Sequence, residues 1–118
     1  MLSTIRAARR LRSLSYLAAI DQGTSSSRVI LYDAETLRPV ASHQVELQAA
    51  TTTPQPGWSQ MDPAAILQSV DAAASGALAQ ARASAKDVVG VGITNQREST
   101  VVWDSRTGEA LFDCVLWH

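Results

Sequence analysis

The chain has 118 residues, of which 46% are hydrophobic and 18% charged, and its formal net charge is −1. This length suffices for one small domain with its own core, and no run approaches the roughly 18 apolar residues that a membrane-spanning helix needs. The single cysteine, Cys114, excludes an internal disulfide, has no metal-ligand spacing around it, and is typical of a small buried residue.

The charge is distributed unevenly. Residues 1–20 carry four arginines and no acid, a net +4, whereas the remaining six basic and eleven acidic side chains give −5. Residues 21–118 are therefore acidic and lack the excess of basic side chains that nucleic-acid binding relies on, which argues against that function. Residues 1–15 are rich in arginine and serine, with an apolar residue at every third position, which is typical of a mitochondrial transit peptide. A disordered extension, or a start codon placed too far upstream, is the alternative interpretation. We therefore expect a cytoplasmic protein, or a mitochondrial one if this extension is a transit peptide.

After the extension, three strands are predicted in an antiparallel meander. Residues 16–21 form a short apolar run that ends at a turn signal, and residues 27–33 form a second run. A polar turn with a proline separates them from residues 40–47, which alternate as a half-buried strand. We expect His43 to lie on the polar face of that strand.

A loop and a helix follow the meander. Residues 48–62 contain two prolines and a glycine and predict a loop. Asp62 is expected to be the N-cap, with Pro63 at the first helical position, of an amphipathic helix over about 63–83. Its apolar residues recur at spacings of three and four: Ile66, Leu67, Val70, Ala73, Ala74, Ala77, Leu78 and Ala81. Gly76 either weakens this helix or permits close packing.

The last third of the chain predicts two more strands, at residues 87–94 and 100–104, then a turn at 105–110. A further strand or loop begins in residues 111–118. The order β-β-β-α-β-β predicts a mixed α/β domain. Because no turn, cap or polar tail follows the apolar residues before His118, we expect a fragment of a longer protein.

The turn between the first two strands, DQGTSSSR at 21–28, has a composition that suits phosphate. It is neither a Walker A loop nor a dinucleotide fingerprint. The glycine, backbone N–H groups and hydroxyls could still bind phosphate, Asp21 could hold Mg²⁺ through water, and Arg28 could add a charged donor. By composition alone, a serine-rich hairpin without a ligand is the favoured interpretation.

A second polar stretch, TNQRES at 94–99, follows a predicted strand, where ligands of α/β sheets bind. Arg97 and Glu98 together offer the donors and acceptors that grip a polyol. Neighbours on an extended strand point opposite ways, so they can share a site only if the strand has already ended. An exposed charge pair is the simpler alternative. For Trp58 and Trp103 we expect packing roles.

Taken together, four segments resemble the FGGY carbohydrate kinase family, in its glycerol kinase branch. They are DQGTSSSR at 21–28, PGWSQMDP at 56–63, GITNQRES at 92–99 and VLWH at 115–118. Their order and spacing match the family over residues 16–118, and N-Q-R-E points to the glycerol branch. The resemblance implies an actin-like, ribonuclease-H-like ATPase fold, here incomplete. It also implies transfer of the γ-phosphoryl group of ATP, with Mg²⁺, to a terminal hydroxyl of glycerol.

The resemblance also implies roles for individual residues in two groups. In the nucleotide group, Asp21 would contact Mg²⁺ through water, Thr24, Ser25 and Ser26 would contact phosphate, and Arg28 would add positive charge. In the glycerol group, Arg97 and Glu98 would hydrogen-bond the hydroxyls, and Trp117 would pack on the carbons. Ser25 stands where the glycerol branch more often has threonine, which keeps the hydroxyl.

The family's aspartate base and its adenosine-binding second domain would lie downstream of His118. We therefore expect that this chain does not phosphorylate glycerol alone, and that the full-length enzyme is a homo-oligomer. Two alternatives stay open: a kinase for another polyol or sugar, and a non-catalytic truncated product or binding fragment.

Overall fold

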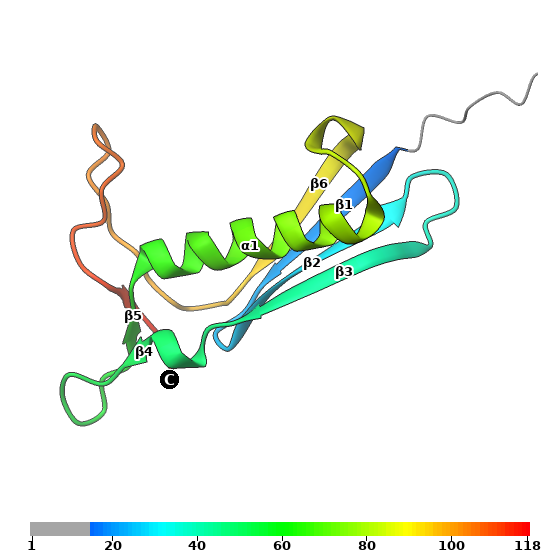
Figure 1. Cartoon of the computed structure of the whole chain (residues 1–118). Helices are drawn as coiled ribbons and strands as arrows, with labels where there is room; N and C mark the ends of the chain where they lie inside the picture. Colours follow the sequence, from blue (N-terminus) through cyan, green and yellow to red (C-terminus); the bar gives the residue numbers. More distant parts are fainter. Residues whose placement is uncertain (1–14) are drawn as a thin grey trace, which may run out of the picture.

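The computed structural model describes residues 15–118, so the predicted N-terminal extension lies, apart from Ser15, outside the described residues. A four-stranded sheet of order β3-β2-β1-β6 carries one long helix on one face, and a small three-stranded sheet of order β4-β5-β7 lies beside the start of that helix (Figure 1). The elements are β1 Tyr16–Gln22, β2 Ser26–Asp33, β3 Pro39–Glu46, β4 Thr51–Thr52, β5 Gln60–Met61, α1 Pro63–Ala81, β6 Val88–Asn95 and β7 Cys114–Val115.

The predicted meander is confirmed, because β1 pairs antiparallel with β2 and β2 with β3. The first turn is closed by a hydrogen bond of 2.8 Å from the Gly23 N–H to the carbonyl oxygen of Ser26. The second turn is held by Asp33, whose Oδ1 accepts hydrogen bonds from the backbone N–H groups of Glu35 and Thr36. Both turns are thus stabilised by residues of the turn itself, glycine in the first and aspartate in the second, which are typical turn residues.

The helix begins as predicted. Asp62 caps it by accepting a 2.8 Å hydrogen bond from the Ala64 N–H, and Pro63 occupies the first turn. It ends two residues earlier than predicted, since Arg82 adopts a left-handed conformation (φ +51°) that terminates the helix.

The main core lies between α1 and the β2–β3 half of the sheet. Its buried apolar residues are Tyr16, Val29, Leu31, Ala41, Ala73 and Ala77. Leu67, which the apolar pattern placed on the buried face, is exposed. The polar-face prediction for His43 is also wrong: its ring faces α1, because Gly76 has no side chain there and an added Cβ would overlap the ring. Gly76 therefore permits close packing of the helix on β3.

A buried pair of hydroxyls links β2 to α1. The Oγ atoms of Ser27 and Ser69 lie 2.7 Å apart, and the exposed fraction is 0% for Ser27 and 4% for Ser69. Because Ser69 donates its proton to the carbonyl oxygen of Ile66 (2.6 Å), Ser27 must donate to Ser69. Ser27, the last of the four hydroxyl residues in the turn segment, is thus buried in the core.

We expect Ser69→Ala to lower the free energy of unfolding by about 1–3 kcal/mol, because it leaves the Ser27 hydroxyl buried without a partner. Replacing both serines by alanine should cost less than the sum of the single changes. Urea unfolding of the parent, the two single variants and the double variant measures both effects. Strict additivity of the two changes would contradict the pairing.

The small sheet organises a second core and corrects two predictions. The segment 48–62, predicted as a loop, contains β4 and β5, and β5 pairs with β7 across more than 50 residues of chain. Residues 100–104 are not a strand: only Thr100 and Trp103 form isolated bridges, to Val115 and Ala110. Residues 100–115 form a hairpin that projects from the body (Figure 1), and the two bridges between its arms do not join into a continuous ladder.

Cys114 is buried in this second core with Leu47, Met61 and Leu116, as predicted for a small buried residue. Burial, together with the nearby Asp113 charge, raises the pKa of the Cys114 thiol. The thiol therefore stays protonated near neutral pH, which suits a packing role.

Strand β6 returns beside β1 and runs parallel to it. A short turn precedes it, in which Asp87 accepts hydrogen bonds from the N–H and hydroxyl of Ser84, and these bonds lower the pKa of Asp87. Because both strands run the same way, their carboxyl ends meet at one edge of the sheet. Within residues 15–118, no helix is long and apolar enough to cross a membrane.

Candidate functional site

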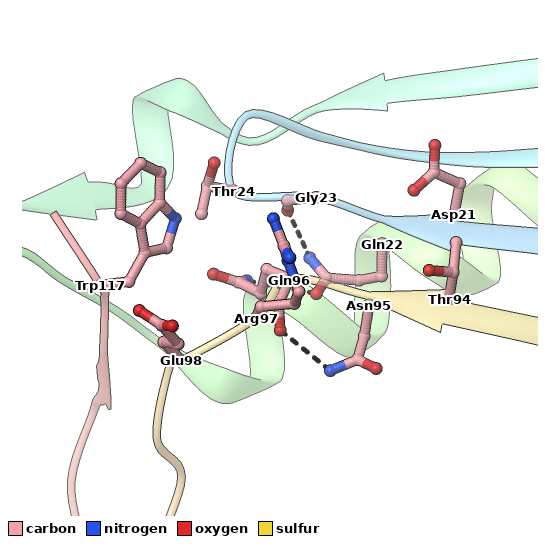
Figure 2. Close-up of a pocket in the computed structure, with 10 residues that line it drawn as sticks. All are labelled: Asp21, Gln22, Gly23, Thr24, Thr94, Asn95, Gln96, Arg97, Glu98 and Trp117. Carbon is pink, nitrogen blue, oxygen red and sulfur yellow. Dashed lines mark hydrogen bonds between the residues drawn. The ribbon is translucent and has the colours of Figure 1, made fainter.

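An open pocket of about 490 Å³ lies beyond the carboxyl ends of β1 and β6. Parallel pairing places Asp21 beside Thr94 and Gln22 beside Asn95, so the two chain segments that leave these strands border the same space. The residues that line the pocket are Asp21, Gln22, Gly23, Thr24, Thr94, Asn95, Gln96, Arg97, Glu98 and Trp117 (Figure 2). It occupies the position where α/β sheets generally bind ligands.

The turn after β1 forms one wall of the pocket. A Cβ added at Gly23 would lie 3.3 Å from the Ser26 carbonyl oxygen, so the tight closure of this turn favours glycine. Thr24 lines the pocket, and Asp21 lies at the end opposite Trp117 (Figure 2). This wall offers a hydroxyl and a carboxylate to a ligand.

Three of the predicted nucleotide residues do not line the pocket. Ser25 and Ser26 lie in the same turn but outside the lining. Arg28 sits directly opposite Asp21 on β2, and its Nε donates a 2.8 Å hydrogen bond to Oε1 of Gln44. Its guanidinium is therefore held along β3, on the face of the sheet away from α1.

The chain after β6 forms the other wall. The strand ends at Asn95, and Glu98 adopts a left-handed backbone conformation, with φ +64°. This conformation is rare for a residue with a side chain and is concentrated at functional sites. Adjacent residues can share a site only where the strand has ended. Arg97 and Glu98 meet this condition, because they follow the end of β6 and both line the pocket.

The ionic groups of this wall are available to a ligand. Within residues 15–118, neither the Arg97 guanidinium nor the Glu98 carboxylate has a hydrogen-bond or ion-pair partner. The Arg97 guanidinium provides several hydrogen-bond donors, and the Glu98 carboxylate provides only acceptors. Together they can bind hydroxyl groups, each of which both donates and accepts.

Trp117 closes the pocket at the end near Glu98, and the residue is 59% exposed (Figure 2). The ring of His118 contacts it edge-on, with centroids 5.1 Å apart. The packing prediction for Trp58 and Trp103 is wrong, since both are more than half exposed. Trp58 lies on a loop and Trp103 on the projecting hairpin, and neither is buried by any other part of residues 15–118.

Gln22 and Gln96 also line the pocket, although neither was predicted to be a site residue. Each is the sequence neighbour of a predicted site residue, Asp21 and Arg97 respectively. Their position at or just after the ends of two strands was the available signal, but only the tertiary structure brings them together, through a 3.2 Å hydrogen bond from Gln96 Nε2 to Gln22 Oε1.

Residues 16–118 match the sequence profile of the N-terminal domain of the FGGY family of carbohydrate kinases. The chain belongs to this family. The predicted fold is thereby confirmed: the described residues form the mixed α/β sheet-and-helix arrangement found at the start of FGGY kinases, which have the actin-like ATPase fold.

Known proteins resemble this FGGY domain over a limited part of their own length. The glycerol kinase of Leptothrix cholodnii is 51% identical over 105 residues, which cover 89% of this chain and 20% of that protein. The Plasmodium falciparum glycerol kinase, solved with ADP, superposes with a TM-score of 0.72 at 30% identity, covering 88% of this chain and 20% of that one. A xyloylose kinase from Brucella ovis gives a TM-score of 0.76 at 28% identity, covering 86% and 21%. The FGGY domain thus spans about a fifth of the length of the relatives it matches.

Proposed function

We propose that this chain is the N-terminal part of an ATP-dependent glycerol kinase. The observation that carries the proposal is the single pocket that joins the Gly23–Thr24 turn to Arg97, Glu98 and Trp117. A phosphoryl donor and a small polyol must meet in one place for phosphoryl transfer, and this pocket borders Asp21 and Thr24 of the first group of residues and all three of the second. The similarity to proteins named glycerol kinase supports the choice of substrate.

In this proposal, glycerol binds at the Trp117 end of the pocket. Arg97 donates hydrogen bonds to glycerol oxygens and Glu98 accepts hydrogen bonds from its hydroxyls, while the Trp117 ring packs on the carbon skeleton. Two hydroxyls held in this way fix the orientation of the third, which is the one to be phosphorylated. In this proposal, Arg97, Glu98 and Trp117 therefore contribute to catalysis by orienting glycerol.

The nucleotide phosphates would lie against the Gly23–Thr24 turn. Thr24 offers a hydroxyl donor, and Asp21 supplies an exposed carboxylate oxygen of the kind that Mg²⁺ prefers. The donor set thus fits Mg²⁺ carried by ATP, which when bound would neutralise charge on the phosphate oxygens. Ser25, Ser26 and Arg28 do not line the pocket, but they lie in or next to the same turn. We propose that they contact the part of the nucleotide phosphates that extends outside the pocket. We assign no catalytic base to residues 15–118.

A chimera tests the proposal. Residues 16–118 would replace the matching segment of the Leptothrix cholodnii glycerol kinase, and ADP release would be measured with glycerol, erythritol and xylulose. We expect glycerol-dependent ADP release from the chimera and none from the 118-residue chain alone. A folded chimera without glycerol-dependent turnover would sink the proposal.

The same measurement separates the two alternatives. Preference for xylulose would favour a sugar kinase, which the superposition on a xyloylose kinase makes the specific competitor. No turnover on any of the three compounds would favour a non-catalytic binding fragment.

We further propose a cytoplasmic enzyme that is homo-oligomeric at full length. A mitochondrial location remains the alternative if residues 1–15 are removed on import. Mass spectrometry of the mature N-terminus in the source cell distinguishes these two locations, because import would leave a chain that begins after the extension.

A further inference from the structure

The two walls of the pocket are joined by a continuous chain of hydrogen bonds. Ser99 Oγ donates to Gln96 Oε1 (2.7 Å), and Gln96 Nε2 donates to Gln22 Oε1 (3.2 Å). Gln22 Nε2 then donates to the carbonyl oxygen of Gly23 (2.6 Å). Figure 2 shows Gln22 and Gln96 between the turn after β1 and the segment that carries Arg97 and Glu98.

Every group in this chain donates in the same direction, from Ser99 towards Gly23. Each carboxamide uses its oxygen to accept from one neighbour and its nitrogen to donate to the next, which fixes the orientation of both amides. Gln22 is 8% exposed, and Gln96 and Ser99 are half-buried. Polar groups in such positions need their partners, so breaking one link leaves the others under-satisfied.

The chain also brackets the substrate-binding residues. The Ser99–Gln96 bond closes a short loop that contains only Arg97 and Glu98, and Glu98 has the left-handed backbone within it. The Gln96–Gln22 bond then ties this loop to the turn that carries Thr24. These three side chains therefore link the segment that carries Arg97 and Glu98 to the turn that carries Thr24.

We propose that Gln22, Gln96 and Ser99 are positioning residues that set the separation between the bound polyol and the bound phosphate. This inference rests on the proposed function, since it assumes a polyol at Glu98 and a phosphate at Thr24. None of the three needs to touch the reacting atoms. A displacement of about 1 Å in such a site can cost about 100-fold in rate, so loosening the chain should lower kcat.

The first test uses the 118-residue chain and needs no ligand. Backbone amide resonances of Gly23 and Thr24 are compared by NMR in Ser99→Ala, Ser99→Thr, Gln96→Met and the control Gln55→Met, which lies on an exposed loop. We expect Ser99→Ala and Gln96→Met to shift both resonances, and Ser99→Thr, which keeps the hydroxyl, to restore them. Unchanged Gly23 and Thr24 resonances in Ser99→Ala would overturn the proposed link.

The second test uses the chimera described above. Ser99→Ala and Gln96→Met should lower kcat by about 10- to 100-fold with a smaller change in the KM for glycerol, and Ser99→Thr should restore kcat. A kcat that is unchanged while the NMR resonances move would overturn the positioning role. An inactive parent chimera would instead count against glycerol kinase activity, and the NMR comparison would still decide whether the two walls are coupled.

Discussion

We expect that replacing Arg97 by alanine in the chimera will lower kcat/KM for glycerol by about 10- to 100-fold. A hydrogen bond to a charged group contributes about 1.5–3 kcal/mol, and each 1.4 kcal/mol corresponds to about a tenfold change. Arg97 lines the pocket without a partner among the described residues, so its donors are free for the substrate. Because the same bonds are present in the bound substrate and during transfer, most of the loss should be in KM.

The matched control is Arg106→Ala. Arg106 has an 88% exposed side chain on the projecting hairpin, where its guanidinium forms a 3.8 Å ion pair with Asp104. This change should leave kcat/KM unaltered. Equal losses in the two variants, or a normal KM for glycerol in Arg97→Ala, would remove Arg97 from the glycerol site.

We expect that replacing Gly76 by alanine will lower the free energy of unfolding by about 1–3 kcal/mol, the usual range for inserting a methyl group into a packed site. At an exposed helical position the same change would raise it by about 1 kcal/mol. Here the added Cβ would overlap the His43 ring, which lies between α1 and β3. The helix would have to move off the sheet, or the ring would have to leave its place. Urea unfolding of the 118-residue chain measures the effect.

Two further variants identify the cause. Ser75→Ala changes the neighbouring exposed residue on the same helix and should be close to neutral. His43→Ala should make Gly76→Ala less harmful than it is in the parent, because the space then exists. Equal effects of Gly76→Ala with and without His43 would show that the ring is not the obstacle.

Local signals predicted much of this fold. The Asp62–Pro63 start of α1 and the hairpin between β1 and β2 each depend on residues within a few positions of one another. Where partners are distant, prediction failed. Strands β5 and β7 have two residues each and pair through Gln60–Val115 and Met61–Cys114, a contact with no local signature. His43 was misplaced for the same reason, since the space for its ring comes from Gly76 on another element.

The candidate site divides in the same way. Asp21, Thr24, Arg97 and Glu98 could be selected from the sequence through the family resemblance of their segments, whereas residue chemistry alone favoured a ligand-free turn and an exposed charge pair. Which of them meet could not be predicted. The parallel pairing of β1 with β6 brings these four residues to one pocket and leaves Ser25, Ser26 and Arg28 outside it.

The sequence by itself determined the local elements, the family resemblance and the chemical character of two polar segments, because these depend on residue type and short-range order. The tertiary structure alone decided that the two segments form one pocket and that a chain of hydrogen bonds from Ser99 to Gly23 joins its walls. The physical reason is that hydrogen bonds of about 3 Å between residues more than 70 positions apart exist only once the sheet has aligned the ends of its strands.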